Sequence, residues 1–360
     1  MGALKSIGLF LVLLSACTPG DETPLPLPTE ELPPFDLDYV TRTLRKTQAM
    51  PATTLSAPLV ALGRRLFFDP ILSKDASISC ATCHRPKHGF AAPDPVAVGF
   101  GHQKGTRNTP TILNRAHGRS QFWDGRAASL EEQALKPIAN PIEMGSSVEA
   151  ALTRLRAADE YPKLFQKAFP DDSSADRVIT EKRLAAALAA FERTLLTRPT
   201  VVDQFQDGRY AALTREQRQG LWIFESRGAC WKCHSGHNYS DEAFHNIGVS
   251  FQQPTPAPGR SAVSGKKSDL RKFRTPTLRQ LERTAPYMHD GSLKTLEEVV
   301  QFYNRGGSQS DPNLDPRIEP LSLSETEIQY LVAFLKALSQ PAAPGLKILQ
   351  QSPTPGQARK

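Results

Sequence analysis

Cys80-Ala81-Thr82-Cys83-His84 is the stretch around which the chain is organised, and it has a second copy, Cys230-Trp231-Lys232-Cys233-His234. Each copy has the form CxxCH, in which two thiols can form thioethers to one porphyrin while the adjacent histidine supplies an imidazole to its iron. Zinc half-sites and redox dithiols also use CxxC pairs, but the histidine at the fifth position of both copies disfavours them. The two motifs therefore predict a protein with two covalently bound c-type haems.

The N-terminus predicts export. Lys5 is followed by a short apolar run over 7–14 and then by Leu14-Ser15-Ala16-Cys17, which resembles a bacterial lipobox. The run is too short to span a bilayer. An ordinary secretory signal with an incidental Cys17 is the alternative, and both agree with haem attachment outside the cytoplasm. We expect a periplasmic protein whose membrane contact is a lipid anchor at Cys17, and Thr18 after it favours the outer membrane.

Composition narrows the class of partner. The 360 residues are enough for two domains. The net charge of +7 is spread along the chain, and no basic block is interleaved with aromatic residues. Nucleic acid is therefore not an expected partner.

Apolar residues at helical spacing and capping signals predict an all-α fold of two c-type cytochrome domains with long loops and one covalent haem each. Long loops are expected over 85–120 and 250–269, and Pro137 and Pro141 are expected to break the helix that begins at Ser129. The predicted helices cover 56–68, 129–136, 148–169, 179–196, 214–226, 295–305 and 324–339. The predicted organisation is a signal peptide (1–17), a flexible tether (18–50), an N-terminal haem domain (51–200), a C-terminal haem domain (201–340) and a disordered tail (341–360).

Five further segments carry a family resemblance, and they occur in the family's order around both motifs. They are Trp123-Asp124-Gly125-Arg126, Glu132-Gln133-Ala134, Asn140-Pro141-Ile142-Glu143-Met144, Thr275-Pro276-Thr277-Leu278-Arg279 and Ala285-Pro286-Tyr287-Met288-His289-Asp290-Gly291. Together with the two CxxCH motifs they resemble the bacterial di-haem cytochrome c peroxidase and MauG family over roughly residues 55–340.

The resemblance implies that Glu143 is the distal acid at the first haem and Gln133 its companion. Heterolysis of hydrogen peroxide needs a proton to move from one oxygen to the other, and a nearby carboxylate can carry it as base and then acid. Without the resemblance, Glu143 in a proline-bounded loop would be taken for a solvated carboxylate. Trp123 matches the aromatic residue between the two haems, where it could relay an electron, although it could also serve only as a core residue.

The sixth ligand of the second haem iron has two candidates. Tyr303 lies on one face of a predicted helix with Leu296 and Val300, so its plain interpretation is a core residue. By resemblance, the matching position is Met in the peroxidases and Tyr in MauG-like proteins. A phenolate favours ferric and higher oxidation states. The resemblance therefore favours Tyr303, with Met288 as the competing ligand.

Two further features follow from the resemblance. Many relatives place a histidine after the first motif that caps the peroxidatic iron, but here Phe100 stands at that position, with His102 two residues later. His88 and His117 are further candidates for that ligand, although each is more simply a loop histidine. The resemblance also implies a calcium site made by Asn108 and the carbonyl oxygens of Thr284 and Pro286, donors that suit this hard cation.

These features predict an exported di-haem peroxidase-like oxidoreductase. It would reduce hydrogen peroxide at the haem of Cys80, Cys83 and His84, with electrons arriving through the haem of Cys230, Cys233 and His234. The electron donor would be a small redox protein, such as a cytochrome c or a cupredoxin, or a protein substrate as in MauG. The alternative is a non-enzymatic di-haem electron carrier, which would have two six-coordinate haems.

Overall fold

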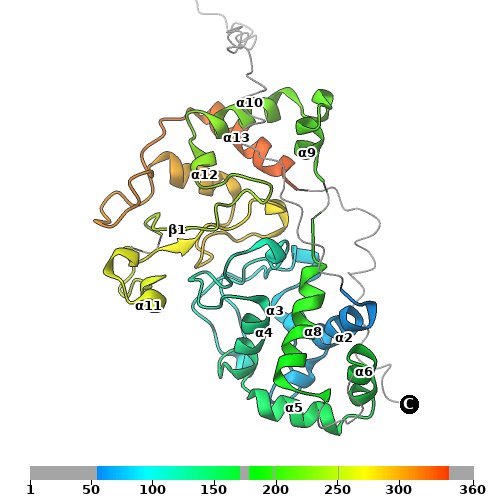
Figure 1. Cartoon of the computed structure of the whole chain (residues 1–360). Helices are drawn as coiled ribbons and strands as arrows, with labels where there is room; N and C mark the ends of the chain where they lie inside the picture. Colours follow the sequence, from blue (N-terminus) through cyan, green and yellow to red (C-terminus); the bar gives the residue numbers. More distant parts are fainter. Residues whose placement is uncertain (1–54, 171–177, 198, 250, 340–360) are drawn as a thin grey trace, which may run out of the picture. The chain divides into compact units, whose positions relative to one another are not determined.

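The computed structural model describes residues 55–339 apart from 171–177, 198 and 250 (Figure 1). The predicted signal peptide, tether and tail lie outside the described residues. All described residues fall within one compact unit that starts at Leu37. The boundary between residues 200 and 201 stays a prediction. Among the described helices, none is long and apolar enough to cross a membrane.

Helices dominate the described part of the chain, which confirms the all-α prediction (Figure 1). They are joined by long segments with short 3₁₀ turns, and the strands form one two-residue antiparallel pair. The helices are α2 (Ala57–Phe68), α3 (Cys80–Cys83), α4 (Leu130–Ala139), α5 (Val148–Ala157), α6 (Tyr161–Ala168), α8 (Glu181–Arg193), α9 (Val201–Gln206), α10 (Arg215–Glu225), α11 (Ser261–Ser264), α12 (Leu296–Asn304) and α13 (Glu325–Ala337), and the strands are β1 (Phe244–His245) and β2 (Phe273–Arg274).

Capping side chains set the helix starts. The hydroxyl of Ser324 accepts a hydrogen bond from the backbone N–H of Glu327, whose carboxylate accepts one from the N–H of Ser324 at 2.9 Å. This reciprocal box satisfies two backbone donors that a helix start leaves unpaired. At Ser129, where the sequence predicts a helix start, the equivalent box is only half formed. Ser129 accepts a hydrogen bond from the N–H of Glu132, but the Glu132 carboxylate accepts from the N–H of Ala128 at 2.8 Å.

Three predicted elements differ from the structure. Pro137 does not end α4, which continues to Ala139, because a proline close to the C-terminus of a helix removes only one of its last hydrogen bonds. The predicted helix over 148–169 is two helices, α5 and α6, and the second begins with Pro162 in its first turn. The loop over 250–269 contains the short helix α11.

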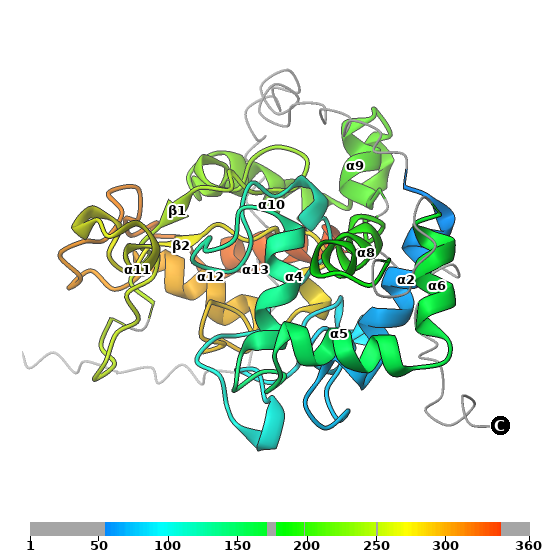
Figure 2. The same cartoon turned by 60° about the horizontal axis from the view of Figure 1, so that its bottom comes forward.

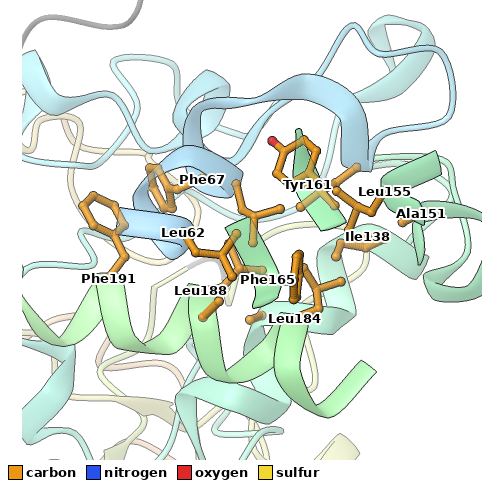
Figure 3. Close-up of a cluster of buried hydrophobic side chains, with 14 of the residues drawn as sticks. Leu62, Phe67, Ile138, Ala151, Leu155, Tyr161, Phe165, Leu184, Leu188 and Phe191 are labelled. Carbon is orange, nitrogen blue, oxygen red and sulfur yellow. The ribbon is translucent and has the colours of Figure 1, made fainter. Parts of the chain in front are cut away.

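The first helix pair builds the core around the first motif. Helices α2 and α8 lie side by side (Figures 1 and 2), and Gly63 lets them approach. A Cβ at Gly63 would lie 1.8 Å from the carbonyl oxygen of Ala187, so no larger residue fits without displacing a helix. Phe67 and Phe191 meet beside this crossing at 5.1 Å between ring centroids. Figure 3 shows both rings in the buried cluster that also holds Leu62.

The second helix pair repeats this arrangement. Helices α10 and α13 lie side by side (Figure 2), and a Cβ at Gly220 would lie 1.9 Å from the carbonyl oxygen of Tyr330. Phe224 and Phe334 meet beside the crossing at 5.1 Å, with the same interplanar angle of 57° as the ring pair of the first helix pair. Each CxxCH motif therefore follows the first helix of an equivalent pair.

Candidate functional site

The first motif forms the one-turn helix α3. Thr82 stabilises its start, since its hydroxyl accepts a hydrogen bond from the N–H of Ser79 at 3.0 Å. The next residue, His84, has its Nδ1 3.0 Å from the carbonyl oxygen of Phe90. A carbonyl can only accept, so Nδ1 carries the proton and Nε2 keeps the lone pair that an iron ligand needs. Burial lowers the pKa of His84, which keeps the imidazole neutral.

The second motif has the same local design in a 3₁₀ turn over Cys230–Lys232. His234 Nδ1 lies 2.9 Å from the carbonyl oxygen of Tyr239, which again leaves Nε2 free. Burial also lowers the pKa of His234. Two neutral imidazoles, each oriented by a backbone carbonyl, are the arrangement that two haem irons require.

The cysteines fit thioether attachment better than a second kind of metal site. The four motif cysteines are free thiols, and burial raises the pKa of both Cys80 and Cys230 to about 12. A metal thiolate would need the deprotonated form. Cys233, Asp241 and His245 lie close enough to share an ion, but Cys233 belongs to a haem motif. His245 is instead held between two carboxylates, at 2.9 Å from Asp241 and 2.8 Å from Asp315.

A cavity beside the first motif brings together residues that the sequence placed at the first haem. Its walls include the two thiols and His84, together with three polar side chains, Gln133, Glu143 and Glu192. Gln133 comes from α4, and Glu143 from the turn that follows it. The predicted distal pair therefore lies in one cavity with the first CxxCH motif.

Glu143 is held in place from two sides. Asn140 Nδ2 donates a hydrogen bond to Glu143 Oε1 at 2.8 Å, and the N–H of Phe100 donates to its backbone carbonyl at 2.9 Å. Burial raises the pKa of Glu143, while the charge of Arg126 and the bond from Asn140 oppose this shift. A half-buried carboxyl with a raised pKa can hold and release a proton nearer to neutral pH.

The structure also locates the residues considered as a capping ligand of the first iron. Phe100 stands against the backbone of Glu143, and His102 is exposed to solvent. His88 and His117 are half-buried elsewhere. Among the described residues that line the first cavity, His84 is the one histidine.

The second cavity contains both candidate ligands for the second iron. Cys230, Cys233 and His234 line it, together with Tyr303 from α12 and Met288. The hydroxyl of Tyr303 makes no hydrogen bond with the described residues, and burial raises the pKa of the phenol well above its usual value. The geometry therefore leaves Tyr303 and Met288 as alternatives, with the free hydroxyl in favour of Tyr303.

Trp123 lies where the chain segment that includes Asn108 is hydrogen-bonded to the segment that includes Arg274 and His289. It is 8% exposed, lines the second cavity, and donates a hydrogen bond from Nε1 to the carbonyl oxygen of Asn108 at 2.9 Å. Two backbone bonds join the segments: the N–H of Asn108 donates to His289 at 2.9 Å, and the N–H of Arg274 donates to Trp123 at 2.8 Å. Trp123 is thus rigidly held by both CxxCH-bearing halves of the chain.

The three residues of the predicted calcium site line the second cavity together. Asn108 Nδ2 donates to the carbonyl oxygens of Asp94 and Pro95 at 3.4 Å and 3.2 Å. Within the described residues no donor reaches Asn108 Oδ1, which is therefore available to a cation. Thr284 and Pro286 line the same cavity, and whether their carbonyl oxygens complete a calcium site stays a prediction.

Sequence reasoning missed two buried polar groups, His289 and Glu192. His289 stacks on Phe273 at 3.7 Å between ring centroids. Its Nε2 is buried at the second cavity and has no hydrogen-bond partner among the described residues. An internal repeat could have found His289. Asn108-Thr109-Pro110-Thr111 repeats as Arg274-Thr275-Pro276-Thr277, and Trp123-Asp124-Gly125 repeats as His289-Asp290-Gly291, which places His289 opposite Trp123.

Comparisons with known proteins agree with this geometry. The family model described as di-haem cytochrome c peroxidase matches residues 57–211. The chain is 39% identical to the methylamine utilization protein MauG of Methylorubrum extorquens, over 86% of this chain and 87% of the relative. It is 38% identical to the cytochrome c551 peroxidase of Nitrosomonas europaea, over 80% of this chain and 81% of the relative.

A solved structure extends the match to the fold. The crystal structure of a MauG-like protein associated with microbial copper homeostasis superposes with a TM-score of 0.77 at 29% identity, covering 90% of this chain and 99% of the other. Two oriented histidines, four free thiols and these relatives lead to one assignment. The chain belongs to the di-haem cytochrome c peroxidase and MauG family, whose members are peroxidase-like oxidoreductases with two c-type haems.

Proposed function

We propose that the protein reduces hydrogen peroxide in the first cavity. The observation that carries the proposal is the position of Glu143, a half-buried carboxyl that lines the same cavity as Cys80, Cys83 and His84. Cys80 and Cys83 would hold the first haem by thioethers and His84 would ligate its iron. Cys230, Cys233 and His234 would do the same for the second haem. When bound, the first haem supplies the redox-active iron at which the O–O bond of peroxide is cleaved.

The protein's own residues handle the protons. Reduction of hydrogen peroxide consumes two electrons and two protons, breaks the O–O bond and gives two waters. Glu143 accepts the proton of one peroxide oxygen and returns it to the other, which then leaves as water. Asn140 keeps the Glu143 carboxyl in one orientation through their 2.8 Å hydrogen bond. Gln133, which lies in α4, positions the peroxide by hydrogen bonding.

When bound, the second haem would supply electron transfer towards the first cavity, and Trp123 would relay the electrons. Tyr303 would hold the second iron through its phenol oxygen, with Met288 as the alternative ligand. A phenolate stabilises the oxidised state, so Tyr303 favours a MauG-like enzyme that stores oxidising equivalents. Calcium bound by Asn108, Thr284 and Pro286 would brace the loops beside Trp123.

The donor belongs to one of two classes. A small redox protein, such as a cytochrome c or a cupredoxin, would give cytochrome c peroxidase activity. A protein substrate oxidised at its surface would give a MauG-like modifying activity, which Tyr303 favours. Export to the periplasm, with a lipid anchor at Cys17 in the outer membrane, is the accompanying proposal for location.

The test uses the holoprotein with both haems attached. We expect a high-spin ferric signal in the oxidised resting state, a spectral change on adding peroxide, and peroxide-dependent oxidation of a reduced cytochrome c or cupredoxin. Two low-spin ferric signals and an unchanged spectrum with peroxide would contradict the proposal. That result would support the second candidate, a non-enzymatic di-haem electron carrier.

A further inference from the structure

Glu192 is a buried acid that the proposed peroxide chemistry does not use. It is 6% exposed and lines the first cavity from α8. Its carboxyl accepts no hydrogen bond and forms no ion pair with the described residues. Burying a carboxylate without a partner is unfavourable, so such a group stays ionised only while a positive charge lies close to it and takes up a proton when that charge is lost. Packing alone does not explain why an acid occupies this buried position.

The second helix pair shows that packing does not require an acid at this position. A Cβ added at Gly63 would meet Ala187 and the Cβ of Phe191, and one added at Gly220 would meet Tyr330 and the Cβ of Phe334, in the same order. The residue after each phenylalanine is therefore equivalent: Glu192 in α8 and Leu335 in α13. Leu335 lines the second cavity as Glu192 lines the first. The same helix position thus presents a carboxyl to one cavity and a leucine to the other.

The charged groups around Glu192 include an ion pair that reaches the surface. Burial raises the pKa of Glu192 to about 8, the charge of Glu131 adds to this shift, and Arg193 and Arg115 oppose it. Cys80 also faces Glu192, and Glu143 lines the same cavity. Glu131 of α4 and Arg193 form a partly exposed ion pair at 2.7 Å, so a charged surface pair lies beside the buried acid.

We propose that Glu192 is a proton-storing positioning residue of the first haem cavity, which takes up a proton from solvent past the Glu131–Arg193 pair when the first haem takes up an electron. The electron comes from the donor of the proposed function and the proton from water. Charge in the cavity therefore stays balanced, and no bond other than the carboxyl O–H forms or breaks at Glu192. Glu143 only moves a proton between the peroxide oxygens, whereas Glu192 brings one in. This role rests on the proposed function.

The experiment measures the reduction potential of the first haem in the holoprotein by spectroelectrochemistry between about pH 5 and about pH 9. Wild type should show a potential that falls with pH, with a slope of up to about 59 mV per pH unit, because one proton accompanies one electron. Glu192→Gln and Glu192→Leu should each lose this slope. Glu225→Gln is the matched control, since Glu225 is a buried acid of α10 next to Cys230, and it should keep the slope.

A second measurement does not depend on the variants. The infrared difference between reduced and oxidised wild type should contain the C=O band of a carboxylic acid that is protonated on reduction. A slope that persists in both Glu192 variants, or a difference spectrum without such a band, would overturn the proposal. If Glu192→Gln does not incorporate haem, Glu192→Leu still tests the proposal, because leucine occupies the equivalent position of α13.

The outcome is separable from that of the proposed function. Neither the potential nor the infrared band requires peroxide. A wild type that keeps the slope but does not react with peroxide would remove the peroxidase proposal and leave the role of Glu192 at the haem. Normal reaction with peroxide in a wild type whose potential does not change with pH would support the peroxidase proposal and overturn the role of Glu192.

Discussion

The two haem-bearing halves of the chain have the same scaffold and different cavities. In each half a glycine lets two helices cross, a phenylalanine pair meets at 5.1 Å, and the motif histidine is oriented by a backbone carbonyl. The first cavity then contains Glu143 and Glu192, and the second contains Tyr303 and Leu335. A few side chains that line the cavities therefore distinguish the proposed peroxide site from the proposed electron-transfer site.

The two halves are also joined in a symmetric way. Asn108 and Arg274 occupy equivalent places in the internal repeat, as do Trp123 and His289. The N–H of Asn108 bonds to His289, and the N–H of Arg274 bonds to Trp123. Each half therefore donates an equivalent backbone hydrogen bond to the other, and these two bonds hold Trp123 and His289 in the wall of the second cavity. Four predictions, in order of decreasing effect, test how far the halves differ.

Glu143→Gln should produce the largest effect. The amide keeps the size of the side chain but cannot carry the proton, so peroxide reduction should fall by roughly 10²–10⁴-fold, the range for loss of a general acid–base. Both haems should remain attached, and the spectrum of the second haem should be unchanged. Stopped-flow absorption after mixing with peroxide checks this. Wild-type kinetics in the variant would show that Glu143 is not the general acid–base. The proposed acid–base difference between the two cavities would then be wrong.

Tyr303→Phe should change the second haem and leave the first haem unaltered. Removing the phenol removes an anionic ligand, so the potential of the second haem should rise by a part of the ~0.8 V range that axial ligands span. Absorption and EPR spectra with a redox titration measure the change. Met288→Leu is the matched control. A second haem that is unaffected by Tyr303→Phe but altered by Met288→Leu would assign the ligand to Met288.

Gly63→Ala and Gly220→Ala should destabilise the protein by similar amounts. The added Cβ would lie 1.8 Å and 1.9 Å from carbonyl oxygens of the facing helices, and forced overpacking of this kind costs about 1–3 kcal/mol. Denaturant unfolding of the holoprotein measures the free energy. Gly105→Ala is the control, because its Cβ would lie 3.5 Å from the nearest atom. Clearly unequal losses would show that the two helix crossings are not equivalent.

Asn108→Ala should give the smallest effect. It removes one oxygen donor of the proposed calcium site, so calcium affinity in calorimetric titration of the chelator-treated holoprotein should fall about tenfold, roughly 1.4 kcal/mol. Asn108→Asp is the matched variant, and its added charge should strengthen binding. Equal calcium affinity in all three proteins, or no binding in wild type, would exclude Asn108 from the site.

Local signals in the sequence predicted most of the helices correctly. Ser56, Thr295 and Ser324 mark helix starts because a hydroxyl that caps a helix acts only on backbone groups within its first turn. The errors, at Pro137 and over 148–169, concern helix ends and interruptions, which depend on packing against other helices. The two CxxCH motifs were equally local, since thioether chemistry needs only neighbouring residues.

The sequence by itself determined the class of the protein: an all-α chain with two haem attachment motifs, a family resemblance, and the identity of Glu143, Gln133 and Tyr303 as candidates. Only the tertiary structure placed Glu143 and Glu192 in one cavity and Tyr303 and Met288 in the other. It also showed that Glu192 and Leu335 are equivalent. The physical reason is that a cavity is formed by residues far apart in the chain, and the burial that raises the pKa of Glu192 exists only once α8 packs against α2 and α4.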